Sequence, residues 1–143
     1  RLSTRKGERQ MSKKKSLWLD RHLITGPYVA LALNEKQFHK AMDDCHIPAS
    51  EHGDWIKTDH SDATVHYLDN DKKELCCIVA IRTKKKQNPN EIVGLLVHEA
   101  THIWQQFCER IGELSPSCEF EAYSIQAISQ TLISAYSDFV AKK

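Results

Sequence analysis

Several features that would mark a membrane protein, a redox protein or a repeat protein are missing from this sequence. Every apolar run is far shorter than the roughly 18 residues that a membrane-spanning helix needs. None of the 5 cysteines forms a C-x-x-C pair, and no segment is repeated. No signal peptide is recognisable either. These absences predict a cytoplasmic protein with one globular domain and no membrane partner.

The cysteines are odd in number and fall mostly within apolar runs, which favours buried, reduced thiols over a disulfide framework. They are Cys45, Cys76, Cys77, Cys108 and Cys118. A zinc site that joins Cys108 or Cys118 to histidines is the weaker interpretation, because thiolate ligands usually make closed, structural sites.

Net charge is also small, at +1, but it is unevenly distributed. Residues 1–15 contain a single acidic residue, Glu8, among arginines and lysines. This pattern predicts a disordered basic tail in front of one domain over residues 16–143. A solvated tail is the commoner case, so it argues only weakly for a nucleic-acid partner.

The most informative motif is H-E-x-x-H, at His98-Glu99-Ala100-Thr101-His102. On a helix, residues i and i+4 project from one face, so His98 and His102 can bind the same zinc ion. Glu99 directly follows the first histidine and points off that axis. It is therefore placed to accept a proton from a metal-bound water as a general base, and it is the predicted catalytic residue.

Flanking residues predict the limits of the helix that carries this motif. Apolar residues recur around it at helical spacing, so much of its surface should be buried. Asn88 is a candidate N-cap with Pro89 at the first helical position, and Gly112 is a natural C-cap. Ser115-Pro116 then offers the cap and first turn of a second long helix.

A catalytic zinc needs a third protein ligand and an open position. No histidine follows His102, which excludes the extended motif with a third downstream histidine. A carboxylate further along the chain is therefore favoured. The segment that suits this role is Cys118–Tyr123.

H-E-x-x-H followed by a helix that bears E-x-x-A resembles the gluzincin branch of zinc metallopeptidases. Glu119-Phe120-Glu121-Ala122 matches the second part of this pattern. More closely, about the last 50 residues resemble small metallopeptidase-like proteins of bacteriophages and prophages. The resemblance implies zinc as the cofactor, Glu119 as the third ligand with Glu121 as its rival, and action on a protein or peptide in a phage-infected or lysogenic bacterial cell.

The middle of the chain predicts a strand, a capped helix and a hairpin with a polar turn, with a loop over residues 47–62. These elements are expected at residues 27–33, 34–42, and 63–68 with 75–82. Strands followed by two long helices favour an α+β, zincin-like minimal domain, with a small antiparallel sheet packed on the zinc helices. The 75–82 strand is the candidate wall for an extended substrate, or equally an internal strand without substrate contact.

The leading hypothesis is therefore a zinc-dependent metallopeptidase. A hydroxyl or imidazole could assist by donating to the oxyanion, and the candidates are His66, Tyr123 and Tyr136, each of which could equally be an ordinary core or surface residue. The alternative is a catalytically silent zincin-fold module that keeps a structural zinc and regulates a partner protein. A non-peptide amidase is a third, weaker possibility.

Overall fold

The computed structural model describes residues 25–84 and 86–142, so the predicted basic tail over residues 1–15 lies outside the described residues. The chain forms an α+β fold in the order β1 (Tyr28–Ala32), α1 (Glu35–Asp44), a short 3-10 turn (Ala49–Glu51), β2 (Ala63–Asp69), β3 (Leu75–Ile81), α2 (Pro89–Ile111) and α3 (Cys118–Ala141). No helix within the described ranges is long and apolar enough to cross a membrane.

The three strands form one mixed sheet in the order β1-β3-β2. β2 and β3 pair antiparallel as the predicted hairpin, while β1 pairs parallel with β3. The prediction of a wholly antiparallel sheet was therefore wrong. A parallel pair needs a long crossover, and the chain supplies one between residues 33 and 74.

β3 is the central strand, and all seven of its residues are buried. The expectation that it forms an open wall for substrate was wrong, because neighbouring strands occupy both of its edges. Its continuous apolar run is typical of a strand covered on both faces. β1 and β2 are the two edge strands, and each has free backbone groups on its outer side; β2 is the edge strand that leads out of the segment beside α2.

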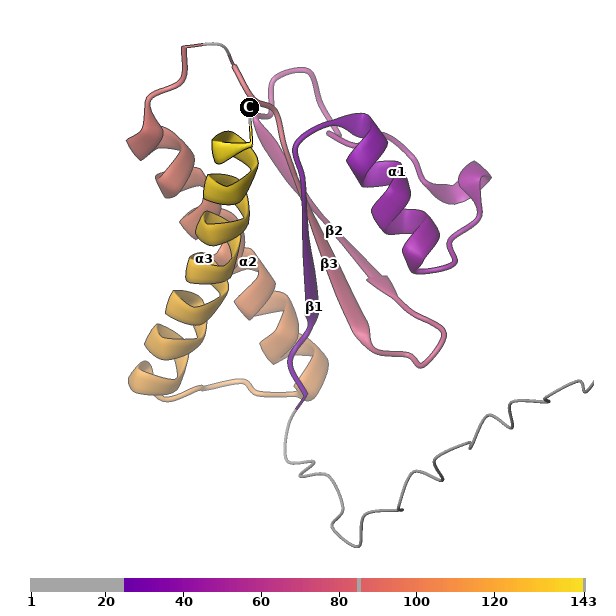
Figure 1. Cartoon of the computed structure of the whole chain (residues 1–143). Coiled ribbons are helices and arrows are strands. Elements are labelled where there is room, and N and C mark those ends of the chain that lie inside the picture. Colours follow the sequence, from indigo (N-terminus) through magenta and orange to yellow (C-terminus); the bar gives the residue numbers. More distant parts are fainter. Residues whose placement is uncertain (1–24, 85, 143) are drawn as a thin grey trace, which may run out of the picture.

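Helices cover both faces of the sheet. α1 lies on one face and the α2–α3 hairpin on the other (Figure 1). The larger core lies beneath α2 and α3, where Leu96, Ile103 and Leu132 are fully buried against alternate residues of β3. Phe38 and Met42 of α1 pack on the opposite face with Ile78.

The ends of α2 follow the residues that predicted them. The Asn88 side chain accepts a hydrogen bond from the backbone N–H of Asn90 at 2.9 Å, and Pro89 begins the helix. Gly112 ends it in the left-handed region at φ 73°. α3 begins two residues later than expected, because Ser117, and not Ser115, is its N-cap.

Candidate functional site

His98 and His102 come together on an exposed side of α2. Their Nε2 atoms lie 3.0 Å apart, and their rings are 4.7 Å apart in an edge-to-face arrangement. One turn of helix separates the two residues, so their spacing follows from α-helical geometry. The predicted pair thus presents two ring nitrogens at a single point in space.

A second hydrogen bond orients one of these rings. The Nδ1 atom of His102 lies 3.1 Å from Oε1 of Gln105. An amide oxygen can only accept, so the proton is on Nδ1 and the Nε2 atom of His102 carries a lone pair. This is the tautomer that binds a metal through Nε2, and a partner on the opposite nitrogen is the usual way to hold a ligand histidine.

Glu99 lies on the inner side of the same helix. The residue is only 6% exposed, whereas both histidines are exposed. Burial raises the pKa of its carboxyl above the usual 4.5, while the nearby His98 and His102 act in the opposite direction. No hydrogen-bond donor within residues 25–84 and 86–142 contacts the carboxylate. A buried carboxylate with a raised pKa and no partner is typical of a group with a chemical role.

A hollow of about 470 Å³ opens beside Glu99 and His98. It lies between the first half of α2 and the segment that leads into β2. Its lining is completed by Ser61, Asp62, Ala63, Glu91, Gly94 and Leu95. The predicted general base therefore faces a space that is open to a substrate.

The edge strand β2 lies along α2 with a definite alignment. At one end, Ala63 shares the hollow with His98. At the other end, Asp69 pairs with the Arg110 guanidinium. Residues of a strand alternate between faces, and Val65 belongs to the core beneath α2, so Tyr67 also faces α2.

Tyr67 is a residue of this region that the sequence analysis missed. Burial, together with the charges of Cys77 and Glu99, raises the pKa of its hydroxyl to about 12, and the side chain is still 40% exposed. Tyr67 is therefore a permanent hydrogen-bond donor within the electrostatic reach of Glu99. The available signal was its alternation with Val65 on a strand next to the motif helix.

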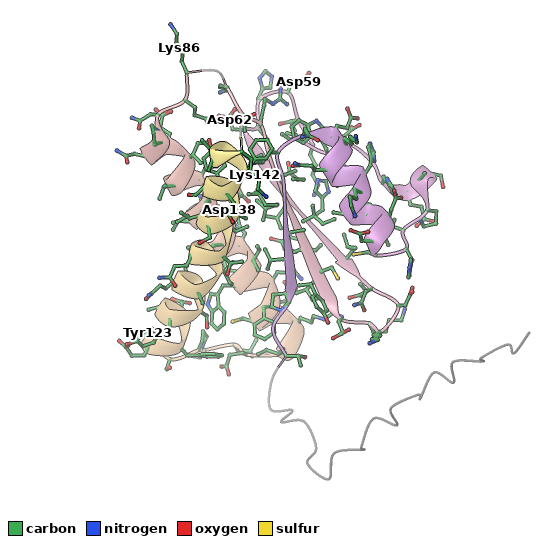
Figure 2. All side chains as sticks on the ribbon, in the orientation of Figure 1. Asp59, Asp62, Lys86, Tyr123, Asp138 and Lys142 are labelled. Atoms are coloured by element: carbon green, nitrogen blue, oxygen red, sulfur yellow. The ribbon has the colours of Figure 1, made fainter. Side chains whose placement is uncertain are left out.

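The proposed third ligands lie elsewhere. Glu119 is exposed in the first turn of α3, where the helix hairpin is connected. His102 precedes the end of α2 by nine residues, or roughly 13 Å along the helix axis. Figure 2 shows Tyr123, one turn after Glu119, at the end of α3 remote from Asp62 and the hollow.

Glu121 contacts α2, but on its buried side. Its Oε2 atom accepts a hydrogen bond of 3.1 Å from the indole N–H of Trp104, which is 2% exposed. Phe120 packs edge-to-face on the same indole at 4.9 Å. In this structure Glu121 therefore fastens α3 to α2.

None of the three oxyanion candidates lines the hollow that contains Glu99. Tyr123 is 65% exposed at the far end of α3. Tyr136 packs against the larger core, and His66 donates to the backbone carbonyl of Trp55 at 2.8 Å on the α1 side of the sheet. Burial lowers the pKa of His66.

Nowhere in the described part of the chain do three or more His, Cys, Asp or Glu side chains form a group that could hold a metal ion. The structure thus brings together His98, Glu99 and His102, and it does not add Glu119 or Glu121 to them. No protein-family model, curated protein or solved structure matches this chain. The geometry and the motif are therefore the evidence on function.

Proposed function

We propose that this protein is a zinc-dependent metallopeptidase with a zincin-like fold, in which His98 and His102 bind the metal and Glu99 is the general base. One observation carries the proposal. Two convergent histidine nitrogens lie next to a buried carboxylate that faces an open hollow and has no hydrogen-bond partner among the described residues. A structural metal site has no use for such a carboxylate beside its ligands.

The histidine pair fits zinc, but it supplies only two ligands. Zinc–nitrogen bonds of about 2.0–2.1 Å place two ligands of a tetrahedral ion roughly 3.3 Å apart, close to the 3.0 Å between the Nε2 atoms. Glu119, with Glu121 as its rival, remains the prediction for the third ligand. Either residue would have to leave its present position to join the pair, and Glu121 would have to release Trp104.

Each residue of the site has a distinct role in the proposed reaction. Zinc, when bound, would supply Lewis acidity to polarise a substrate carbonyl. Glu99 would take up a proton from the attacking water, a task suited to a carboxylate whose pKa is raised by burial. The free edge of β2 would pair with an extended peptide through backbone hydrogen bonds.

The second candidate is a zincin-fold interaction module with a structural zinc and no turnover. The lack of a three-ligand group among the residues that the structure describes bears on both candidates, because a structural zinc needs four protein ligands and a catalytic zinc three. For either function we propose a cytoplasmic setting in a phage-infected or lysogenic bacterial cell, which rests on the resemblance and on five unpaired cysteines.

The deciding experiment compares wild type with Glu99→Gln at matched zinc occupancy, in a digestion of a broad peptide library. We expect Glu99→Gln to bind zinc normally and to lose about 10²–10⁴-fold of the activity. Glu109→Gln is the matched control, because this exposed glutamate lies on the same helix outside the hollow.

Equal activity in wild type and Glu99→Gln would refute the assignment of the base. A zinc-loaded wild type that cleaves no peptide would favour the interaction module instead. The zinc content of Glu119→Ala and Glu121→Ala identifies the third ligand, because only the variant that lacks this ligand should lose zinc.

A further inference from the structure

The hollow beside Glu99 is lined by acidic side chains from two separate parts of the chain. Asp62 comes from the segment before β2, Glu91 from the first turn of α2, and Glu99 from its middle. Among the described residues, no lysine or arginine belongs to its lining. The outer end of the hollow is therefore electronegative.

The partners of these carboxylates differ. Asp62 pairs with Lys84 at 2.9 Å, which holds its side chain in place and offsets its charge. Glu91 is exposed and has no ion-pair partner within the described ranges. Glu91 is thus the carboxylate that is free to bind a cation from outside.

Glu99 is an independent sign that the hollow takes a ligand. It is more than nine-tenths buried, lines this space and receives no hydrogen bond from the described residues. The Glu99 oxygens are not among the enclosed side-chain atoms that lack a partner, so they open onto the hollow. Here the side from which a partner can arrive is the hollow.

The hollow has room for a long side chain at the Glu91 end. Gly94 lies between Glu91 and His98, and a methyl group added at Gly94 would meet no atom within 4 Å. Glu91 precedes His98 by seven residues, or roughly 10 Å along the helix. A cation beside Glu91 would lie about one Debye length from a metal held by the histidines, so the two charges would repel each other only weakly.

We infer that this hollow is a subsite for a cationic group of the substrate, an ammonium or guanidinium that Glu91 binds at its outer end while Glu99 faces the bond to be cleaved. The inference rests on the proposed function. It names the substrate class as peptides with a lysine, an arginine or a free amino terminus close to the scissile bond.

The test measures binding to chelator-treated protein, which cannot turn substrate over. Fluorescence anisotropy compares labelled, N-acetylated peptides that contain either lysine or acetyl-lysine at one position. We expect lysine to bind about two- to fivefold more tightly, the range of a partly exposed ion pair. Glu91→Gln should abolish this difference, and Glu109→Gln, with the same change in net charge, should retain it.

Gly94→Leu supplies a second test that leaves every carboxylate in place. Its side chain should fill the hollow and weaken the binding of the lysine peptide, while thermal unfolding reports that the helix is intact. Peptides with free and acetylated amino termini, both without lysine, distinguish an α-ammonium from a side-chain cation as the occupant. A gain from the free terminus also supports the inference.

Equal binding of lysine and acetyl-lysine peptides, with no gain from a free amino terminus, would overturn the inference. So would an equal loss in Glu91→Gln and Glu109→Gln, which would indicate general electrostatics. The two hypotheses can fail independently. A protein that binds lysine peptides preferentially but cleaves no peptide would retain the cationic subsite and refute the peptidase. A protein that cleaves peptides but binds lysine and acetyl-lysine equally would be a peptidase without this subsite.

Discussion

Two pairs of histidines lie on opposite sides of the sheet, and they differ in their surroundings. His98 and His102 are exposed on α2, 3.0 Å apart at Nε2, beside the carboxylate of Glu99, to which no residue of the described ranges donates a hydrogen bond. His39 and His52 lie 2.8 Å apart at Nδ1 on the α1 side, where His52 is 5% exposed. Close approach of two imidazoles is therefore common to both pairs and does not by itself indicate a metal site.

The two pairs differ in what surrounds their rings and ring nitrogens. His52 donates from Nε2 to the backbone carbonyl of Ile47 at 2.9 Å and accepts at Nδ1 from His39, so every polar atom of this ring has a protein partner. Phe38 packs against both rings. The α1 pair is explained by packing and hydrogen bonding. In the α2 pair the two Nε2 atoms hydrogen-bond to each other on an exposed helix surface, where a metal ion can reach them and replace the shared proton.

The largest expected difference between the two pairs is in zinc affinity. His98→Ala or His102→Ala should weaken zinc binding by more than about 100-fold, because each removes one of only two histidine ligands. His39→Ala should leave zinc affinity unchanged. Competition with a chromogenic chelator measures both, and equal losses in the two pairs would invalidate the distinction.

The next effect concerns stability. His52→Ala should lower the free energy of unfolding by about 2–3 kcal/mol, because it leaves a cavity against Phe38 and an unpartnered carbonyl at Ile47. His98→Ala, on an exposed helix surface, should change it by less than about 0.5 kcal/mol in metal-free protein. Urea unfolding checks this, and a larger cost for His98→Ala would show that the α2 pair is structural.

Neighbouring residues of β2 sharpen the comparison further, since Tyr67 faces α2 and His66 faces α1. Tyr67→Phe should reduce peptide hydrolysis at least about tenfold, because it removes a hydroxyl donor that faces α2 within the electrostatic reach of Glu99. It should leave zinc content and the unfolding midpoint almost unchanged. His66→Gln is the matched control and should retain activity, and an unaffected Tyr67→Phe enzyme would exclude Tyr67 from the site.

The smallest effect is a pH dependence on the α1 side. Burial lowers the pKa of His66 below 6.5, so the unfolded chain takes up a proton more readily than the native protein. The contribution of His66 to stability is therefore full above pH 6.5 and decreases as the pH falls toward the lowered pKa. His66→Gln should give a shallower slope of unfolding free energy between pH 6.5 and 5, measured in urea, and an unchanged slope would contradict the assignment.

Local signals in the sequence predicted the elements better than their arrangement. Asn88, Pro89 and Gly112 mark the ends of α2 because capping chemistry is local. The parallel pairing of β1 with β3 depends on residues far apart in the chain, so no local pattern announces it. The seven consecutive apolar residues of β3 are a local signal for a strand covered on both faces, and this agrees with the central position of β3 in the sheet.

In the candidate site, too, local spacing was predictable and the packing of distant residues was not. The H-E-x-x-H spacing is sufficient to place His98 and His102 together, because one helical turn determines their separation. Glu119 depends on how two helices align. In an antiparallel hairpin, residues near the connection face each other, so the start of α3 lies beside the end of α2 and not beside its middle.

The parallel pairing of β1 also has a consequence for how the chain folds. Tyr28 pairs with Cys76, 48 residues later, whereas β2, β3, α2 and α3 are contiguous between residues 63 and 141. Closing the long loop costs more entropy than forming the hairpin, so β1 should join a sheet that already exists. During synthesis, β1 and α1 leave the ribosome well before their partner strand β3, and the histidine pair on α2 belongs to the contiguous segment that follows.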